Sequence, residues 1–191
     1  MHRVVAFIDG LNLYHAVRSL EDSRLEWCDV VSLSRLFLRR NERLKTVHYY
    51  NAYPHHLSQS RRQRYKRYTK SVCASGARLV EGRFKRKGCT HEEKETDVNI
   101  ALDMLDLAYR GEFDKCFLVS GDSDLKPAVE RVLANFPRKS VTILAPPGQH
   151  VNDFRNLRHA HRGRLEVMQI KRSHLRESVF HVELPPLPVL A

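Results

Sequence analysis

Apolar runs of strand length alternate with helical patterns along this chain. The first run covers residues 3–8 and is typical of a strand buried on both faces, and a helical pattern over residues 11–20 follows it. Alternation of this kind predicts an α/β fold, namely a three-layer α/β/α sandwich around a mostly parallel central sheet. The further strands that we predict cover residues 47–53, 77–82, 114–119 and 140–145.

The length of 191 residues is that of one domain with a substantial core. We expect this domain over residues 1–170, with a short edge strand at 165–170, and a C-terminal extension over residues 171–191 that ends in a proline-rich tail. No apolar run approaches the ~20 residues that a membrane span requires, and the first run is shorter than the ~7–15 residue core of a signal peptide. Four cysteines without a paired motif fit free thiols, so we expect a cytoplasmic protein with no membrane partner.

Carboxylates follow two of the predicted strands. Asp9 comes directly after the first strand, and Asp122 and Asp124 stand one residue apart after the fourth. Because right-handed crossovers bring the carboxyl ends of parallel strands to one edge, we expect Asp9 and Asp122 on the same edge and Asp124 just beyond it. Carboxylates this close repel each other unless cations lie between them, so we predict a site for divalent metal. The alternative is that Asp9 only caps the following helix.

A further carboxylate, Asp97, opens the most regular helical pattern in the chain. Its simplest role is a favourable charge at the helix N-terminus. Strand order alone leaves Asp97 at the opposite edge of the sheet, unless the long basic loop that we predict over residues 83–96 climbs back over the top. Asp103 lies further along the same helix, about 240° around it from Asp97, and is a weaker candidate for a supporting group.

The charge of +11 points to a polyanionic partner, because clustered Lys and Arg gain affinity for nucleic acid by releasing counterions. A helix over residues 61–75 carries six basic residues and no acid within residues 60–70. Its apolar positions can face the sheet, which turns the basic side chains outward. The alternatives are a solvated helix face here and a mobile surface loop at residues 83–89.

Three blocks of sequence resemble the NYN domain family of the PIN-like nuclease superfamily, and more closely its bacterial LabA-like branch. The blocks are residues 7–13, residues 94–104 and residues 118–127, and the resemblance extends over about residues 3–170. It implies a PIN-like sandwich with a metal-dependent ribonuclease site, and it implies that Asp97 reaches the acidic cluster. Leu125 replaces the more usual Phe, which is a change in core packing.

The resemblance carries roles onto matching positions. The acidic, metal-binding role falls on Asp9, Asp97, Asp122 and Asp124, and polar supporting roles fall on Asn12 and Ser120. Four aspartates without histidine suit Mg²⁺ or Mn²⁺ and suit zinc poorly. Two such ions about 3.5–4 Å apart can clamp the attacking and leaving oxygens of a phosphodiester, although one ion is the alternative. We expect products with a 5′-phosphate and a 3′-hydroxyl.

The function that these residues favour is hydrolysis of single-stranded RNA with weak sequence selectivity. The alternative is an RNA-binding or scaffold protein that keeps the metal pocket without turnover. A phosphatase or nucleotide-binding protein is disfavoured by the lack of a P-loop and of GxGxxG. We also expect a homodimer and a protein partner for the proline-rich tail, with Phe84 or a tyrosine stacking on a base. The backbone-binding residues that we predict are Arg61, Arg62, Arg64, Lys66, Arg67, Lys85, Arg86 and Lys87, joined by Arg155, Arg158, Arg162 and Arg164.

Overall fold

The computed structural model describes the backbone of residues 1–87 and 90–180 and the side chains of residues 1–84 and 94–180. Its strands are β1 (His2–Asp9), β2 (Glu42–Ala52), β3 (Ala77–Lys87), β4 (Thr90–Lys94), β5 (Lys115–Val119), β6 (Ser140–Ala145) and β7 (Leu165–Gln169). Its helices are α1 (Gly10–Arg18), α2 (Val30–Leu36), α3 (Gln59–Ala74), α4 (Thr96–Tyr109), α5 (Lys126–Asn135), α6 (Asn152–Ala160) and α7 (Arg172–Glu177), with 3₁₀ turns η1 (Leu25–Trp27) and η2 (Ser123–Leu125).

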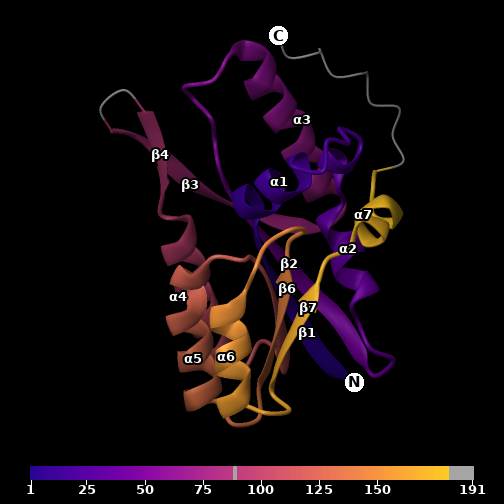
Figure 1. Ribbon diagram of the computed structural model, residues 1–191, viewed down its shortest axis with the longest axis vertical. Helices are drawn as coiled ribbons and strands as arrows, with labels where there is room; N and C mark the ends of the chain where they lie inside the picture. Colours follow the sequence, from indigo (N-terminus) through magenta and orange to yellow (C-terminus); the bar gives the residue numbers. More distant parts are fainter. Residues whose placement is uncertain (88–89, 181–191) are drawn as a thin grey trace.

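A seven-stranded sheet in the order β4-β3-β2-β1-β5-β6-β7 forms the centre of the molecule. Six neighbouring strands are parallel, and β4 alone runs antiparallel to its neighbour β3. Helices cover both faces of the sheet (Figure 1), which confirms the predicted α/β sandwich. Strand β1 lies between β2 and β5, with Asp9 opposite Tyr50 and Ile8 opposite Val119. The carboxyl ends of β1 and β5 therefore meet in the middle of one edge.

The side chains of β1 alternate between two apolar cores. Val5 and Phe7 pack into a core that α4, α5 and α6 cover, whereas Ala6 and Ile8 pack into a core that α1, α2, α3 and α7 cover. All four are at most 2% exposed. The strand is thus buried on both faces, as its continuous apolar run predicts, and it fixes the position of Asp9 at its end.

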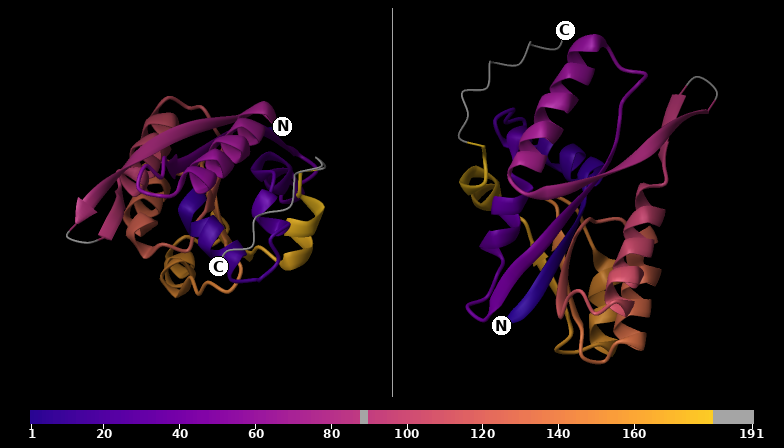
Figure 2. Two further views of the ribbon diagram at one scale, coloured as in Figure 1. Left: turned by 90° about the horizontal axis from the view of Figure 1, so that it is seen from above. Right: turned by 180° about the vertical axis from the view of Figure 1, so that it is seen from behind.

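The predicted loop over residues 83–96 is wrong in its backbone structure, because a β-hairpin occupies most of it. Strand β3 continues to Lys87, and β4 returns antiparallel with Arg83 opposite Lys94. Pairing of the two strands satisfies backbone groups that a loop leaves to water. The hairpin projects past the carboxyl edge of the sheet (Figure 2), and α4 begins at that edge after β4.

Residues 171–180, which we expected to follow the domain as an extension, pack onto it. Leu175 of α7 is fully buried in the core beneath α2. The N–H of Phe180 donates to the carbonyl of Trp27 at 3.0 Å, and the N–H of Asp29 donates to that of Ser178 at 2.6 Å. The proline-rich tail over residues 181–191 lies outside the described residues. In the part of the chain that the structure describes, no helix is both long and apolar enough to cross a membrane.

Candidate active site

Asp9 holds the end of β1, the start of α1 and the end of β5 together. Its Oδ1 accepts a hydrogen bond from the Asn12 N–H at 3.0 Å, and its Oδ2 accepts one from Ser120 Oγ at 2.9 Å. The first bond is a helix N-cap, so the capping role is real, and the second ties the carboxylate to the neighbouring strand. Gly10 is required next to it, because a Cβ there would lie 2.5 Å from the carbonyl oxygen of Tyr50.

Two further hydrogen bonds lock the turn after β1 against the turn after β5. Asn12 Oδ1 accepts from the Gly121 N–H at 3.0 Å, and Ser120 Oγ accepts from the Asp122 N–H at 3.1 Å. Asp122 in turn caps η2, because its Oδ1 accepts from the Asp124 N–H at 2.9 Å. These bonds bring Asn12 and Ser120 to the acidic residues and fix the backbone that carries Asp122.

Burial governs the charge of Asp9, which is only 5% exposed. Desolvation raises the pKa of Asp9 to about 7, the hydrogen bonds from Asn12 and Ser120 oppose that rise, and the negative charges of Asp97 and Asp122 add to it. The structure thus brings Asp97, in the first turn of α4, within electrostatic reach of Asp9. A helix that leads from one parallel strand to the next begins at the carboxyl edge, so the expectation that strand order leaves Asp97 at the opposite edge is wrong.

Asp124 and Asp103 occupy different surroundings from Asp9. Asp124 lies on η2 with an exposed side chain, next to Asp122. Asp103 accepts a hydrogen bond from the Tyr50 hydroxyl at 2.7 Å, and its charge also acts on buried His48. The structure therefore places Asp103 as the anchor of Tyr50 under α4, with no hydrogen bond to the Asn12–Ser120 network.

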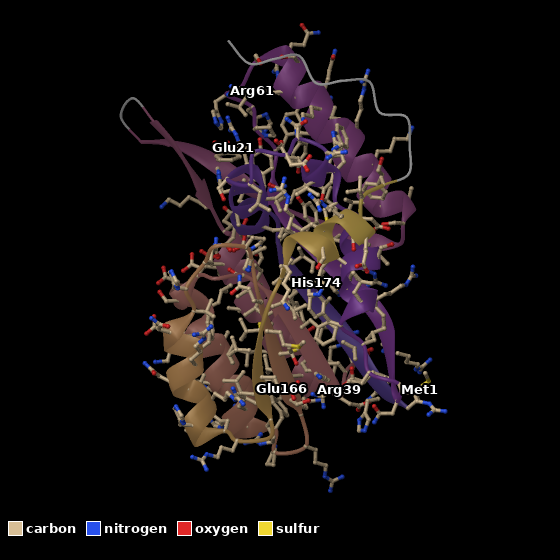
Figure 3. All side chains as sticks on the ribbon, turned by 45° about the vertical axis from the view of Figure 1, so that its right-hand side comes forward. Met1, Glu21, Arg39, Arg61, Glu166 and His174 are labelled. Atoms are coloured by element: carbon tan, nitrogen blue, oxygen red, sulfur yellow. The ribbon has the colours of Figure 1, made fainter. Side chains whose placement is uncertain are left out.

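The basic helix α3 projects its N-terminal half past the carboxyl edge, where Arg61 lies far from Arg39 and Glu166 at the other edge (Figure 3). Arg61, Lys66 and Arg67 are exposed, and Lys66 lies 5.6 Å from the ring centre of Tyr53. Arg62, also predicted to bind RNA, is half-buried, and no ion pair joins it to an acid in the described part of the chain. Lys85, Arg86 and Lys87 belong to β3, and their side chains lie outside the described ones.

Two predicted backbone-binding arginines have partners within the fold. Arg64 pairs with Glu26 and lies over the ring of Trp27 at 5.7 Å. Arg164 donates to the carbonyl of Leu133 at 2.8 Å and so satisfies the C-terminal end of α5. Both arginines find partners from distant parts of the chain, which a count of local charges does not reveal.

Gln149 is a residue of this site that the sequence does not single out. It lies in the turn after β6, and its Oε1 is buried without a hydrogen-bond partner among the described residues. A Cβ on Gly121 would clash with that oxygen, so the amide covers the backbone between Ser120 and Asp122. Gln149 follows β6, the third strand that ends at this edge, and that position in the sequence is the signal that could have pointed to it.

The donors present fit a hard divalent cation in their chemistry. Carboxylate oxygens are what Mg²⁺ and Mn²⁺ prefer, and each oxygen of Asp9 keeps a lone pair beyond the one in its hydrogen bond. The orphaned amide oxygen of Gln149 adds a further polar atom beside the same turn. Within the described residues, however, no three His, Cys, Asp or Glu side chains are drawn together into a group that could hold a metal.

Comparison with known proteins matches residues 3–162 to the model of the NYN domain. The chain belongs to the NYN domain family. NYN domains are PIN-like, generally nucleases, and such nucleases typically use divalent metal ions. No curated protein matches the chain. A protein of unknown function from Vibrio parahaemolyticus has a similar structure, with a TM-score of 0.61 and 19% identity over 90% of this chain and 94% of that one. At this identity the likeness shows the fold alone.

Proposed function

We propose that this NYN protein is a metal-dependent ribonuclease that hydrolyses phosphodiester bonds in single-stranded RNA. The observation that carries the proposal is the buried carboxylate of Asp9, which is bonded to Ser120 and lies within reach of the charges of Asp97 and Asp122. Negative charges gathered at the carboxyl edge of a parallel sheet are unfavourable without a cation. The sequence blocks favour the LabA-like branch of the family.

The residues that would hold Mg²⁺ or Mn²⁺ are Asp9, Asp97, Asp122 and Asp124. A bound cation of this kind supplies Lewis acidity at a phosphoryl oxygen and favours a hydroxide nucleophile at neutral pH. Asn12 and Ser120 position the two turns that carry Asp9, Asp122 and Asp124, through the bonds to Gly121, Asp122 and Asp9. Products with a 5′-phosphate and a 3′-hydroxyl follow from in-line attack at phosphorus with the 3′-oxygen as leaving group.

Exposed cations near the same edge support RNA as the substrate. Arg61, Lys66 and Arg67 on α3 are exposed, and the aromatic ring of Tyr53 lies beside Lys66. Cations that neutralise phosphates next to a ring on which a base can stack are typical of sites for single strands. Phe84 is half-buried against His56, with ring centres 4.7 Å apart, so it offers less free surface for stacking.

The test is cleavage of labelled single-stranded RNA with Mg²⁺ or Mn²⁺, with and without chelator, by the parent protein and by Asp9→Asn and Asp122→Asn. We expect cleavage by the parent protein that chelator abolishes and that both variants lack. A matched control is Asp106→Asn, which changes an exposed aspartate of α4 paired with Arg110. Cleavage that persists in both active-site variants would show that a contaminating nuclease is at work.

An RNA-binding scaffold without turnover is the second candidate, and a specific observation favours it. No group of three potential ligands is assembled among the described residues, so a cation would have to draw the carboxylates together. RNA binding by the parent protein, without cleavage under any divalent ion tested, would select this candidate. Cleavage that depends on Asp9 would exclude it.

A further inference from the structure

A pocket with a mixed aromatic and charged lining lies between α3 and β3. It has a volume of about 390 Å³, within the ~300–1,000 Å³ range of sites for small ligands. Its lining includes Tyr53, Tyr65, Lys66, Lys70, Leu79 and Glu81. Aromatic rings and cations side by side are typical of sites that hold a nucleotide, whose base is flat and whose phosphate is anionic.

This α3–β3 pocket adjoins the edge of the sheet that carries the acidic residues. The strand register shows this, because Tyr50 of β2 lies opposite Asp9 on one side and opposite Val80 on the other. Glu81 follows Val80, so two strand spacings of ~4.8 Å put its Cα about 10 Å from that of Asp9. Tyr53 lies just beyond the end of β2. An RNA strand that runs from the acidic residues across the end of β2 therefore reaches the pocket.

The two tyrosine rings of the pocket form a corner in which a flat base can lie. The ring centres of Tyr53 and Tyr65 are 5.4 Å apart and their planes meet at 83°, so a base stacked on one ring borders the edge of the other. Lys66 Nζ lies 5.6 Å from the ring centre of Tyr53, which puts a cation for phosphate beside the ring. Stacking on an aromatic ring is possible for every base, so the rings supply affinity without a preference.

Glu81 is the group in the pocket that can distinguish one base from another. Its side chain is exposed, and its Oε1 accepts a hydrogen bond from the Tyr65 hydroxyl at 3.3 Å, which orients the carboxylate. In the described part of the chain no ion pair joins Glu81 to Lys66 or Lys70, although all three line the pocket. The pocket thus offers a carboxylate that accepts hydrogen bonds next to ammonium groups that donate them.

Guanine is the base whose edge matches this arrangement. Its Watson–Crick edge presents two adjacent donors, N1–H and the N2 amino group, and its O6 acceptor lies next to them. Adenine, cytosine and uracil each present a single donor group on that edge. A carboxylate accepts both guanine donors at once, and such charge-assisted bidentate contacts are the strong ones. A lysine beside the carboxylate can donate to O6.

We propose that the α3–β3 pocket binds a guanine base of single-stranded RNA, stacked on a tyrosine ring with its N1–H and N2 amino group on Glu81. This inference rests on the proposed function and adds to it a base preference, where the sequence predicts weak selectivity. A free guanine nucleotide presents the same edge. RNA is favoured as the source because the pocket adjoins the acidic residues.

The test measures binding in chelator by fluorescence anisotropy of labelled RNAs of about eight nucleotides, within the site sizes of single-strand binders. Both RNAs are uridylates with one central purine, which is guanine in one and adenine in the other, so stacking is matched. The pocket variant is Glu81→Met, which keeps the length of the side chain and removes the carboxylate. The control is Glu177→Met, which changes an exposed glutamate of α7 without an ion pair among the described residues. Both variants lose one negative charge.

We expect the parent protein and the control variant to bind the guanine RNA about 5- to 150-fold more tightly than the adenine RNA, the range for a bidentate contact to a base edge. Glu81→Met should bring this ratio close to 1. The ratio is insensitive to a general change in charge, which affects both RNAs alike. Equal binding of the two RNAs by the parent protein would overturn the inference, and so would a Glu81→Met protein that keeps the ratio of the parent.

Calorimetric titration with guanosine 5′-monophosphate, also in chelator, separates the two sources of guanine. We expect it to bind more weakly than the guanine RNA, because it lacks the neighbouring phosphates that exposed cations neutralise. If the free nucleotide binds as tightly as the guanine RNA, the pocket is a site for free nucleotides and the inference is overturned.

Failure of this inference is distinguishable from failure of the proposed function. If the parent protein cleaves RNA but binds both RNAs equally, only the base preference is refuted. If it prefers the guanine RNA through Glu81 but cleaves no RNA with any divalent ion, the ribonuclease proposal fails and the pocket stands. If it binds neither RNA, both fail. Thermal unfolding shows whether the fold is intact, and we expect both variants to unfold within a few degrees of the parent protein.

Discussion

Replacing Asp9 with Asn should stabilise the metal-free protein above neutral pH. Folding raises the pKa of Asp9 from 3.8 to about 7. That difference in pKa corresponds to about 4 kcal/mol of unfolding free energy lost when the carboxyl is ionised. Asparagine occupies the same space, keeps an acceptor for the Asn12 N–H and can donate to Ser120 Oγ. It removes the buried charge without removing the cap.

The pH dependence has a definite sign. Because the pKa of Asp9 is higher in the folded state than in the unfolded state, the loss is absent below about pH 4, grows between about pH 4 and 7, and is complete above that range. We therefore expect Asp9→Asn to exceed the parent protein by up to about 4 kcal/mol at alkaline pH in chelator, and to lose that advantage in acid. For a chain of this size this corresponds to a rise in Tm of about 10 °C.

Thermal unfolding in chelator across this pH range, followed by circular dichroism, measures the effect. Addition of Mn²⁺ at a concentration 100 times the dissociation constant should then stabilise the parent protein by about 2.7 kcal/mol, which raises its Tm, and should leave Asp9→Asn unchanged. Asp106→Asn is the control, because its exposed pair with Arg110 contributes little. If the Asp9→Asn protein is less stable than the parent at alkaline pH in chelator, the inference that burial and neighbouring negative charges make ionised Asp9 unfavourable is refuted.

Three other changes test parts of the structure outside that charge. Asp114→Asn should destabilise the protein at neutral pH and have no effect near pH 2. The hydrogen bond from Arg3 lowers the pKa of Asp114 to about 2, so the stability that the ionised carboxylate contributes is lost as pH falls through that value. Urea unfolding at both pH values measures this. Lys115→Met should cost about 3–5 kcal/mol, because it leaves Glu42 buried without its partner at 3.1 Å, and adding Glu42→Gln should recover part of the loss in the same assay. Gly121→Ala should reduce the rate of RNA cleavage more than it reduces stability, with both losses expressed as free energies, because the new Cβ would displace the Gln149 amide that covers the turn. Equal free-energy losses in cleavage and in unfolding would contradict this.

Strand β1 and the acidic turns were within reach of sequence reasoning because their signals are local. A continuous apolar run that ends in Asp9 predicts both the burial of the strand and the position of the carboxylate at its end. The hairpin of β3 and β4 was missed because consecutive charges at residues 85–87 hide the alternation that marks a strand. Asp97 was within reach of strand order too, because a helix between two parallel strands begins at the carboxyl edge, and only the family resemblance was read correctly there.

The roles of Arg64 and Gln149 show a different limit. Arg64 belongs to a basic run, yet Glu26 and Trp27, which hold it, are more than thirty residues away in the chain. Gln149 carries no motif, and only the packing of its amide on Gly121 shows its connection to the site. Residues that come into contact only after folding cannot be predicted from local residue type or spacing.

The hairpin of β3 and β4 also allows the length of its projecting arm to change independently of the position of Asp97. Its two strands leave the sheet and return to it, so adding one residue to each strand would lengthen the arm by about 3.4 Å while the start of α4, and Asp97 with it, stayed in place. Insertion into one strand alone would instead rotate the side chains beyond it to the opposite face. Within this architecture, the span over which the protein contacts a long ligand is therefore adjustable in paired steps without altering the arrangement of its carboxylates.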